Sequence, residues 1–283
     1  GYTFNGWYTK KDGGEKITSE DIVKITKDVT LYAQWTINSY ELTIDPNGGT
    51  YNTSGETQKF TLNYNQIMRV LKPVRVGYTF VSWNLEGKGS MTSLVDEATF
   101  TTGAGDTKLT ADWQINVYAI KFDADGGTVN ESMRDIEYNQ AYGQMPIPSK
   151  TGYIFAGWYD GNELVTEQTK ATKDTTLVAK WSAKDVSLTI KYGDGVKQDD
   201  VVNSKYDKTV TLTKPVREGY TFTGWNLVSG NSTVLSSTSQ DSVVIMGSED
   251  TVVEATWEAN EYKVTYETNG GELQELVKYT KYD

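Results

Sequence analysis

Two short motifs recur along this sequence, and together they decide how the chain folds. The first occurs as GYTFNGWY from Gly1, GYTFVSWN from Gly77, GYIFAGWY from Gly152 and GYTFTGWN from Gly219. The second ends in tryptophan each time, as LYAQW to Trp35, LTADW to Trp113, LVAKW to Trp181 and VEATW to Trp257. Because these pairs account for all eight tryptophans of the chain, the sequence is a tandem repeat.

A third motif precedes each GY segment and sets the order within a repeat. It occurs as YELTIDPNGG from Tyr40, YAIKFDADGG from Tyr118, VSLTIKYGDG from Val186 and YKVTYETNGG from Tyr262. We predict complete repeats at residues 36–113, 114–181 and 182–257. Residues 1–35 are expected to be the C-terminal half of a truncated repeat, and residues 258–283 the N-terminal half of another.

The motifs have the two-residue period of β-strands. In YAIKFD, Tyr118, Ile120 and Phe122 alternate with more polar residues. In LYAQW, Leu31, Ala33 and Trp35 form one apolar face, which indicates a strand with one side on a core. Trp7 is out of phase with Tyr2 and Phe4, so we expect a β-bulge at Gly6 that redirects the indole ring.

Turn and helix signals complete the prediction of a β-rich α+β unit. Asn47-Gly48 and Asn269-Gly270 favour type I′ turns, which would lead into second strands at Lys59–Leu62 and Leu273–Tyr279. Thr18–Thr26 carries helix-capping residues and is expected to form one short turn of helix. Ser132–Tyr138 is a weaker helix candidate.

The tryptophans are predicted to be structural. A small unit has little core, so buried aromatic side chains contribute a large part of its stability. We therefore expect all eight tryptophans to belong to repeat cores. They are Trp7, Trp35, Trp83, Trp113, Trp158, Trp181, Trp225 and Trp257.

The composition narrows the classes of function. The chain has 283 residues with 27 Lys+Arg and 38 Asp+Glu, and the net charge of −11 argues against nucleic acid and anionic membrane surfaces as partners. It has no histidine and no cysteine, and no apolar run long enough to span a bilayer. Carboxylates are plentiful, but no acid pair recurs with the repeat. We predict no catalytic residue, no cofactor and no metal ligand, and hence no enzyme.

Two sets of residues carry possible binding chemistry. Asp123-Ala-Asp125-Gly126-Gly127 resembles the start of a calcium loop, but Gly127 and Arg134 occupy later ligand positions, and a hairpin turn is the favoured interpretation. Tyr8, Tyr32 and Tyr159 are candidates for binding a glycan or a protein partner through exposed rings. Asn84 and Asn226 replace Tyr8 and Tyr159 in the alternate repeats, which favours an ordinary surface.

The joints between repeats are short. Residues 36–39, 114–117, 182–185 and 258–261 separate each terminal tryptophan from the next first motif, and none of them is Gly or Pro. Such joints favour limited bending over a loose coil, so we expect an elongated array.

The combination of NGG, GYTFxGWY and LYAxW resembles the internalin B-repeat family, also called the Listeria–Bacteroides repeat. The resemblance covers nearly the whole chain and is best at Gly1–Tyr8 with Leu31–Trp35 and at Gly152–Tyr159 with Leu177–Trp181. Lys191–Gly195 departs from the family turn. The resemblance implies small β-grasp-like domains that act as a non-catalytic stalk or adhesion region of a secreted or wall-anchored bacterial surface protein.

The partners expected from this resemblance are host or cell-surface proteins or glycans, for a chain that is monomeric within a longer protein and inserts into no membrane. An extracellular location at the cell surface or cell wall is expected with it. The alternatives are a carbohydrate-binding array and an accessory region of a larger extracellular enzyme.

Overall fold

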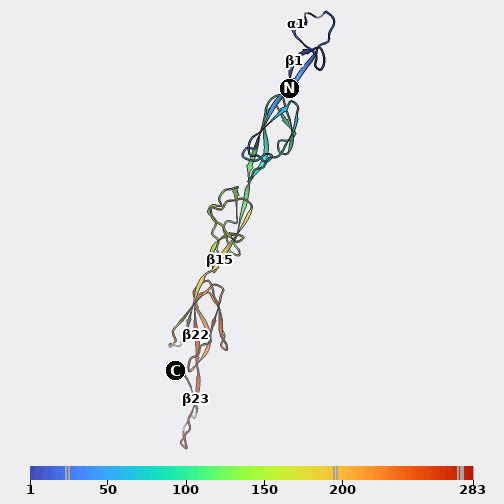
Figure 1. Ribbon diagram of the computed structural model, residues 1–283. Helices are drawn as coiled ribbons and strands as arrows, with labels where there is room; N and C mark the ends of the chain where they lie inside the picture. The colour runs from blue at the N-terminus through green and yellow to red at the C-terminus, as the bar shows by residue number, and fades with distance from the viewer. Residues whose placement is uncertain are drawn as a thin grey trace. The chain divides into compact units, whose positions relative to one another are not determined.

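The fold is all-β. The computed structural model describes residues 1–22, 24, 26–193, 195, 197–272, 274 and 277–282, and within these ranges small β-sheets follow one another along the sequence (Figure 1). The one helix in this part of the chain is α1 (Ser19–Ile22). The prediction of β-rich repeats in tandem is confirmed, whereas the α+β and β-grasp parts of it are not.

The contacts divide the chain into two compact units. The first comprises Gly1–Tyr118 with Asp135–Gln140 and Lys170–Lys173. The second comprises Ala119–Arg134, Ala141–Thr169 and Asp174–Asp283.

The described residues of the first unit form three sheets. One has the order β2 (Lys16–Ile17), β1 (Tyr2–Tyr8), β3 (Tyr32–Ile37). The next has the order β5 (Gln58–Asn63), β4 (Ser39–Asp45), β10 (Thr107–Ile115), β7 (Tyr78–Gly87). A smaller sheet has the order β6 (Ile67–Val70), β9 (Ala98–Thr101), β8 (Ser90–Met91).

The second unit holds the corresponding sheets of the later repeats. A five-stranded sheet, most of which lies in this unit, has the order β12 (Met133–Glu137), β11 (Val117–Asp123), β15 (Thr175–Ala183), β13 (Tyr153–Asp160), β14 (Glu163–Leu164). The next sheet has the order β17 (Asp200–Lys205), β16 (Asp185–Lys191), β22 (Thr251–Ala259), β19 (Tyr220–Ser229). A smaller sheet has the order β18 (Thr209–Leu212), β21 (Ser242–Ile245), β20 (Thr233–Leu235). A hairpin of β23 (Glu261–Thr265) and β24 (Val277–Lys281) comes last.

The main sheets share one topology. The first strand of a repeat lies parallel to its Trp-ending strand, which in turn is antiparallel to its GY strand. The parallel register places Ile44 opposite Leu109, Phe122 opposite Leu177 and Ile190 opposite Val253. Because both strands of this pair are central, their inward side chains are buried, as Ile44, Leu109 and Val253 are.

A β-bulge in every GY strand brings phenylalanine and tryptophan to the same face. The register shifts between Phe4 and Gly6, between Phe155 and Gly157 and between Phe222 and Gly224. In β7 the pairing passes from Phe80 to Ser82 in the same way, although serine replaces glycine there. Residues three apart in a regular strand lie on opposite faces, so the extra residue is required to align them. The bulge predicted at Gly6 is confirmed.

The bulge builds a triad of one phenylalanine and two tryptophans in each repeat. Phe80 meets Trp83 and Trp113 edge-on, with ring centroids 5.5 and 5.6 Å apart. The same contacts recur in the triads Phe155, Trp158, Trp181 and Phe222, Trp225, Trp257. The first tryptophan of each is buried, and the second is partly buried.

The second tryptophan of each triad also ties the sheet to the turn after the first strand. Trp113 Nε1 donates to the Pro46 carbonyl at 3.0 Å, Trp181 Nε1 to Ala124 at 3.0 Å, and Trp257 Nε1 to Tyr192 at 2.8 Å. The first tryptophans differ from one another. Trp158 Nε1 donates to Pro146 at 2.8 Å, whereas the buried Nε1 atoms of Trp83 and Trp225 have no acceptor among the described residues.

Trp7 and Trp35 depart from the prediction that all eight tryptophans are in cores. Their exposed fractions are 47% and 56%, although Phe4 still contacts both rings. The physical reason is the sheet in which they lie. Within the described residues β3 has β1 as its partner and has no parallel first strand beside it, so no turn covers the Trp35 ring.

The local predictions have mixed outcomes. Asn47 and Gly48 both have positive φ, and Gly49 N–H donates to the Pro46 carbonyl at 2.9 Å, as a type I′ turn requires. The turn does not lead directly into the second strand, which begins only at Gln58 and extends past the expected Lys59–Leu62 to Asn63. Asn269-Gly270 forms the same turn.

The helix predictions fare differently. The helix predicted at Ser132–Tyr138 is wrong, because β12 (Met133–Glu137) is a strand, with the Ile136 side chain buried on one face. The helix predicted at Thr18–Thr26 is shorter, since α1 covers Ser19–Ile22. Just before it, the backbone N–H of Thr18 donates to Asp21 Oδ2 at 3.0 Å. Val23 and Ile25 lie outside the described residues. So do Asp194 of the Lys191–Gly195 segment and three residues of the expected Leu273–Tyr279 strand, Leu273, Glu275 and Leu276.

Trp113 and Trp35 offer a matched test of what the triad contributes. We expect Trp113→Ala to destabilise its sheet by about 3–5 kcal/mol, because it leaves a cavity and removes the bond to Pro46. Trp35→Ala, at the same motif position but largely exposed, is expected to cost less than about 1 kcal/mol. Native-state hydrogen exchange of β10 and β3 amides measures both; equal losses would contradict the assignment.

Candidate functional site

The most regular polar arrangement in the chain lies where one repeat passes to the next. One residue at each joint, which is Asn38, Asn116, Lys184 or Asn260, bonds to both neighbouring repeats through its backbone. Its N–H donates to the carbonyl of the preceding GY glycine at 2.8–2.9 Å, at Gly1, Gly77, Gly152 and Gly219. Its carbonyl accepts the N–H of a tyrosine in the following repeat at 2.8–2.9 Å, from Tyr64, Tyr138, Tyr206 and Tyr282.

Each of these four tyrosines also packs against the tyrosine of the preceding GY segment. The ring pairs meet edge-to-face, which is a favourable geometry for aromatic side chains. Their centroids are 5.8 Å apart for Tyr2 and Tyr64, 6.3 Å for Tyr78 and Tyr138, 5.3 Å for Tyr153 and Tyr206, and 5.6 Å for Tyr220 and Tyr282.

The GY glycine is required by this contact. A Cβ atom at Gly77 would lie 1.9 Å from a Tyr138 ring carbon, and one at Gly152 would lie 2.4 Å from the Tyr206 ring. Both glycines also have φ of +77°, which other residues rarely adopt. The glycine of the most regular motif in the sequence is therefore the surface on which the next repeat's tyrosine rests.

These joint tyrosines are structural residues that the sequence prediction missed. A signal was present, because each is followed by Asn or Asp in the pairs Tyr64-Asn65, Tyr138-Asn139, Tyr206-Asp207 and Tyr282-Asp283. Asn65, Asn139 and Asp207 have positive φ and turn the chain directly after the tyrosine.

A side-chain clasp adds to the backbone bonds at three joints. The Thr3 hydroxyl donates to Asn38 Oδ1 at 2.6 Å, and Asn38 Nδ2 donates to the Tyr40 hydroxyl at 3.3 Å. Thr79, Asn116 and Tyr118 repeat this arrangement at 2.7 and 3.4 Å, as do Thr221, Asn260 and Tyr262 at 2.6 and 3.4 Å. We call this set of contacts the joint clasp.

An aspartate just before three of the Trp-ending strands, β10, β15 and β22, holds the first strand of its repeat. Asp106 Oδ1 accepts the Glu41 N–H at 2.8 Å, Asp174 Oδ1 that of Ala119 at 3.0 Å, and Asp250 Oδ1 that of Ser187 at 2.8 Å. Bonds from the backbone and side chain of Ser187 lower the pKa of Asp250. The nearby charge of Lys184 lowers the pKa of this carboxyl further.

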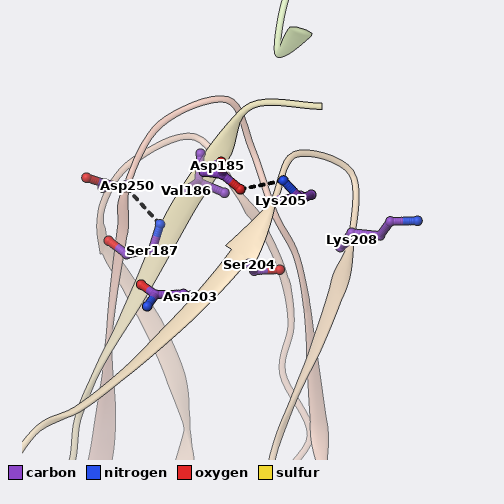
Figure 2. A pocket seen from close by; sticks show the side chains of 8 residues that line it. All are labelled: Asp185, Val186, Ser187, Asn203, Ser204, Lys205, Lys208 and Asp250. Atoms are coloured by element: carbon purple, nitrogen blue, oxygen red, sulfur yellow. Dashed lines mark hydrogen bonds and ion pairs between the residues drawn. The ribbon is translucent and has the colours of Figure 1, made fainter. Parts of the chain in front are cut away.

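A hollow of about 700 Å³ lies beside the Lys184 joint (Figure 2). Its two carboxylates are already engaged, one with a lysine and the other with the backbone. Asp185 pairs with Lys205 at 2.5 Å, and the Asp250 carboxylate points to the Ser187 nitrogen. The hollow is an open polar surface of the joint, and its contacts give it a structural role.

The predicted binding tyrosines lie in two separate places. Tyr8 and Tyr32 are directly opposite each other in the β1–β3 ladder, so their rings share one face, where Tyr8 is half-buried and Tyr32 is exposed. Tyr159 is half-buried in β13, with Lys180 Nζ 4.1 Å from its ring centroid. A cation over an aromatic face is a common surface contact, which leaves less of the Tyr159 face open to a ligand.

The segment resembling a calcium loop forms a turn. Asp125 N–H donates to Asp123 Oδ1 at 2.9 Å, and Gly127 N–H donates to the Ala124 carbonyl at 3.0 Å. Lys150 Nζ donates to the Asp125 carbonyl at 2.7 Å, which brings a positive charge to this turn. Within the ranges that the structure describes, no group of three or more acidic, His or Cys side chains is gathered to hold a metal ion.

No helix in the described ranges is long and apolar enough to cross a membrane.

Two family models match the chain. The model of the Listeria-Bacteroides repeat domain matches residues 1–34, 40–112 and 118–180. The model of the divergent InlB B-repeat domain matches residues 186–261.

Relatives in two bacteria align with the chain. A protein of Evansella cellulosilytica named "Putative Gly-rich membrane protein" is 33% identical over 286 residues, which covers 96% of this chain and 32% of that relative. A second protein of this species, named "Putative membrane protein", is 30% identical over 278 residues, covering 94% and 40%. Internalin H of Listeria monocytogenes is 43% identical over 84 residues, covering 29% and 14%. The chain thus spans well under half the length of each of these relatives.

The Asp250 contact predicts a pH dependence. Because hydrogen bonds lower the pKa of this carboxyl in the folded state, its stabilising effect is present above the ordinary carboxyl pKa of about 3.9 and is lost as pH falls through the folded-state value. We expect Asp250→Asn to destabilise the chain at pH 7, with the difference from wild type shrinking below about pH 4. Thermal unfolding across pH measures this.

The control for this prediction is Asp199→Asn, which removes an exposed carboxylate from the same repeat. It is expected to leave stability nearly unchanged at pH 7. A deficit of Asp250→Asn that stays constant down to pH 2.5, or an equal deficit in the control, would be evidence against the Asp250 contact.

Proposed function

Because this chain belongs to the Listeria-Bacteroides repeat domain family, with a divergent InlB B-repeat at residues 186–261, we propose that it is a non-catalytic stalk and adhesion region of a bacterial surface protein. It extends other parts of a longer protein away from their point of attachment. The observation that carries this proposal is the joint, which is built four times from the same backbone bonds and the same tyrosine pair.

The joint supports a spacer because it spans the connection between repeats with specific contacts. A loose linker has its backbone groups in water. Here the joint residue bonds to both neighbours, and a ring of the next repeat rests on a glycine of the previous one. Contacts of this kind restrict movement at the joint, which is what a spacer requires of its connections.

The β-grasp-like description is part of the proposal. The order β12-β11-β15-β13-β14 supports it, because the first and last strands of that repeat are adjacent, parallel and central. An initial hairpin lies on one side of this pair, and the GY strand lies on the other. In the described residues of repeat 114–181 no helix crosses the sheet, so the resemblance rests on strand order.

The cellular setting follows from the same reasoning. We place the chain outside the cell, at the surface or in the wall, as a monomeric part of a longer protein without a cofactor of its own. Its partners are a host or cell-surface protein or a glycan. The names of the Evansella relatives, which include the words membrane protein, support a location at the cell envelope. An accessory role beside a catalytic domain elsewhere in a longer chain is the alternative.

A carbohydrate-binding array is the second candidate, and one observation favours it. Tyr8 and Tyr32 face each other across two strands, and Tyr32 is 40% exposed. Two neighbouring rings on one face form a surface on which a sugar can stack. The pair occurs where β1 and β3 meet, and Asn84 takes the place of Tyr8 in the next repeat.

Small-angle scattering of the whole chain tests the stalk. A compact globule of this length has a radius of gyration of about 19 Å. We expect a clearly larger value and a long, asymmetric distance distribution, because the proposed stalk requires repeats arranged end to end. A radius near that of a globule would refute the stalk.

A glycan array tests the second candidate. If the array function is right, wild-type protein binds a set of glycans, and Tyr32→Ala and Tyr8→Ala each reduce that binding at least tenfold, because a stacking ring is lost. Asn84→Ala, the matched change in the alternate repeat, is expected to have no effect. Absence of binding at high protein concentration would exclude this function.

A further inference from the structure

We infer that the joint at Lys184 is the compliant joint of the array, where neighbouring repeats change their relative direction most readily. This inference rests on the proposed stalk function, because compliance matters in a chain whose task is to hold distance. It arises from a comparison of the four joints, which share their backbone bonds but not their side chains.

The clasp joins both repeats through one asparagine. In the joint at Asn116, Oδ1 accepts from Thr79 of the preceding repeat at 2.7 Å, and Nδ2 donates to Tyr118 of the following repeat at 3.4 Å. The asparagine side chain therefore ties the two repeats to each other. The joints at Asn38 and Asn260 have the same three residue types in the same places.

All three clasp positions are changed together at the remaining joint. Ile154 stands where the others have threonine, Lys184 where they have asparagine, and Val186 where they have tyrosine. Neither isoleucine nor valine has a side-chain hydrogen-bonding group, so no clasp can form. The Ile154 side chain is 56% exposed, and Val186 is buried in the core of its own repeat.

Lys184 makes a different contact, and that contact joins only one side. Its Nζ donates to the Ser248 carbonyl at 3.2 Å, and Ser248 belongs to the following repeat. Among the described residues, this is the one side-chain hydrogen bond of Lys184. The joint residue is thus held to the repeat after it, while its side chain makes no hydrogen bond to the repeat before it.

The shared parts of the joint remain in place. Lys184 N–H donates to Gly152 at 2.9 Å, Tyr206 N–H donates to Lys184 at 2.9 Å, and Tyr153 packs edge-on against Tyr206 at 5.3 Å. These contacts are the ones that all four joints share, so at Lys184 they hold the two repeats without the added restraint of a side-chain clasp.

Spin-label distance measurements on the whole chain test the inference. Because the chain has no cysteine, pairs of introduced cysteines are labelled without interference. Val81→Cys with Asp135→Cys spans the Asn116 joint, and Ala156→Cys with Asn203→Cys spans the Lys184 joint. The two pairs occupy equivalent positions in their repeats, and all four side chains are exposed.

We expect a broader distance distribution across Lys184 than across Asn116. The fraction of molecules outside the principal distance should be about fivefold larger, which is the factor given by one ordinary hydrogen bond. Equal widths across the two joints would overturn the inference.

Exchanging the clasp gives the decisive control. Lys184→Asn with Ile154→Thr is expected to narrow the Ala156–Asn203 distribution, and Asn116→Lys with Thr79→Ile to broaden the Val81–Asp135 distribution. Circular dichroism verifies that each variant is folded, and the two exchanges are judged separately. Widths that do not respond to either exchange in folded protein would refute the role of the clasp.

Scattering and label distances, measured on the same chain, test the stalk and the compliant joint independently. An extended particle with equal widths at both joints would refute the compliant joint and leave the stalk intact. A compact particle in scattering would refute the stalk, while the ranking of the two joints would still be decided by the label distances.

Discussion

The fold depends on one constraint, which is that a phenylalanine and a tryptophan three residues apart must lie on the same side of a strand. A regular strand puts them on opposite sides. A β-bulge removes this conflict. At Gly6, Gly157 and Gly224 the bulge is formed by a glycine with φ between +129° and +140°. The resulting triads lie in the small cores, and the second tryptophan of a triad donates a hydrogen bond to the turn after the first strand.

The joint uses the other end of the same strand. In GYTF, the phenylalanine faces inward to the triad, while the glycine and tyrosine before it receive the next repeat. One strand therefore serves its own core and its neighbour at once. This explains why the GY segment is the most regular motif of the sequence, although the joint glycine takes no part in the core.

The sequence was sufficient for the repeats, their strands, the bulge and the family, because each leaves a local pattern of spacing or alternation. It was insufficient where the structure depends on a partner distant in sequence. Trp35 has the same motif as Trp113 but lacks a first strand beside it. The role of the joint tyrosines depends on a contact between residues far apart in sequence, such as the packing of the Tyr138 ring on Gly77. The helix predicted at Ser132–Tyr138 is instead a strand, because its short polar stretch shows no clear alternation and its conformation is set by pairing in the sheet. The proposed binding role of Tyr8, Tyr32 and Tyr159 stays a prediction.

The reuse of the joint has a consequence for how such genes change length. Gly77 and Gly152 present the same surface, and Tyr138 and Tyr206 fit it in the same way, so a repeat can be duplicated or deleted without inventing a new interface. The number of repeats is then free to change in steps of one module. Among the four joints described, the one at Lys184 lacks the Thr–Asn–Tyr set, so a module exchanged at that boundary would meet different side-chain contacts.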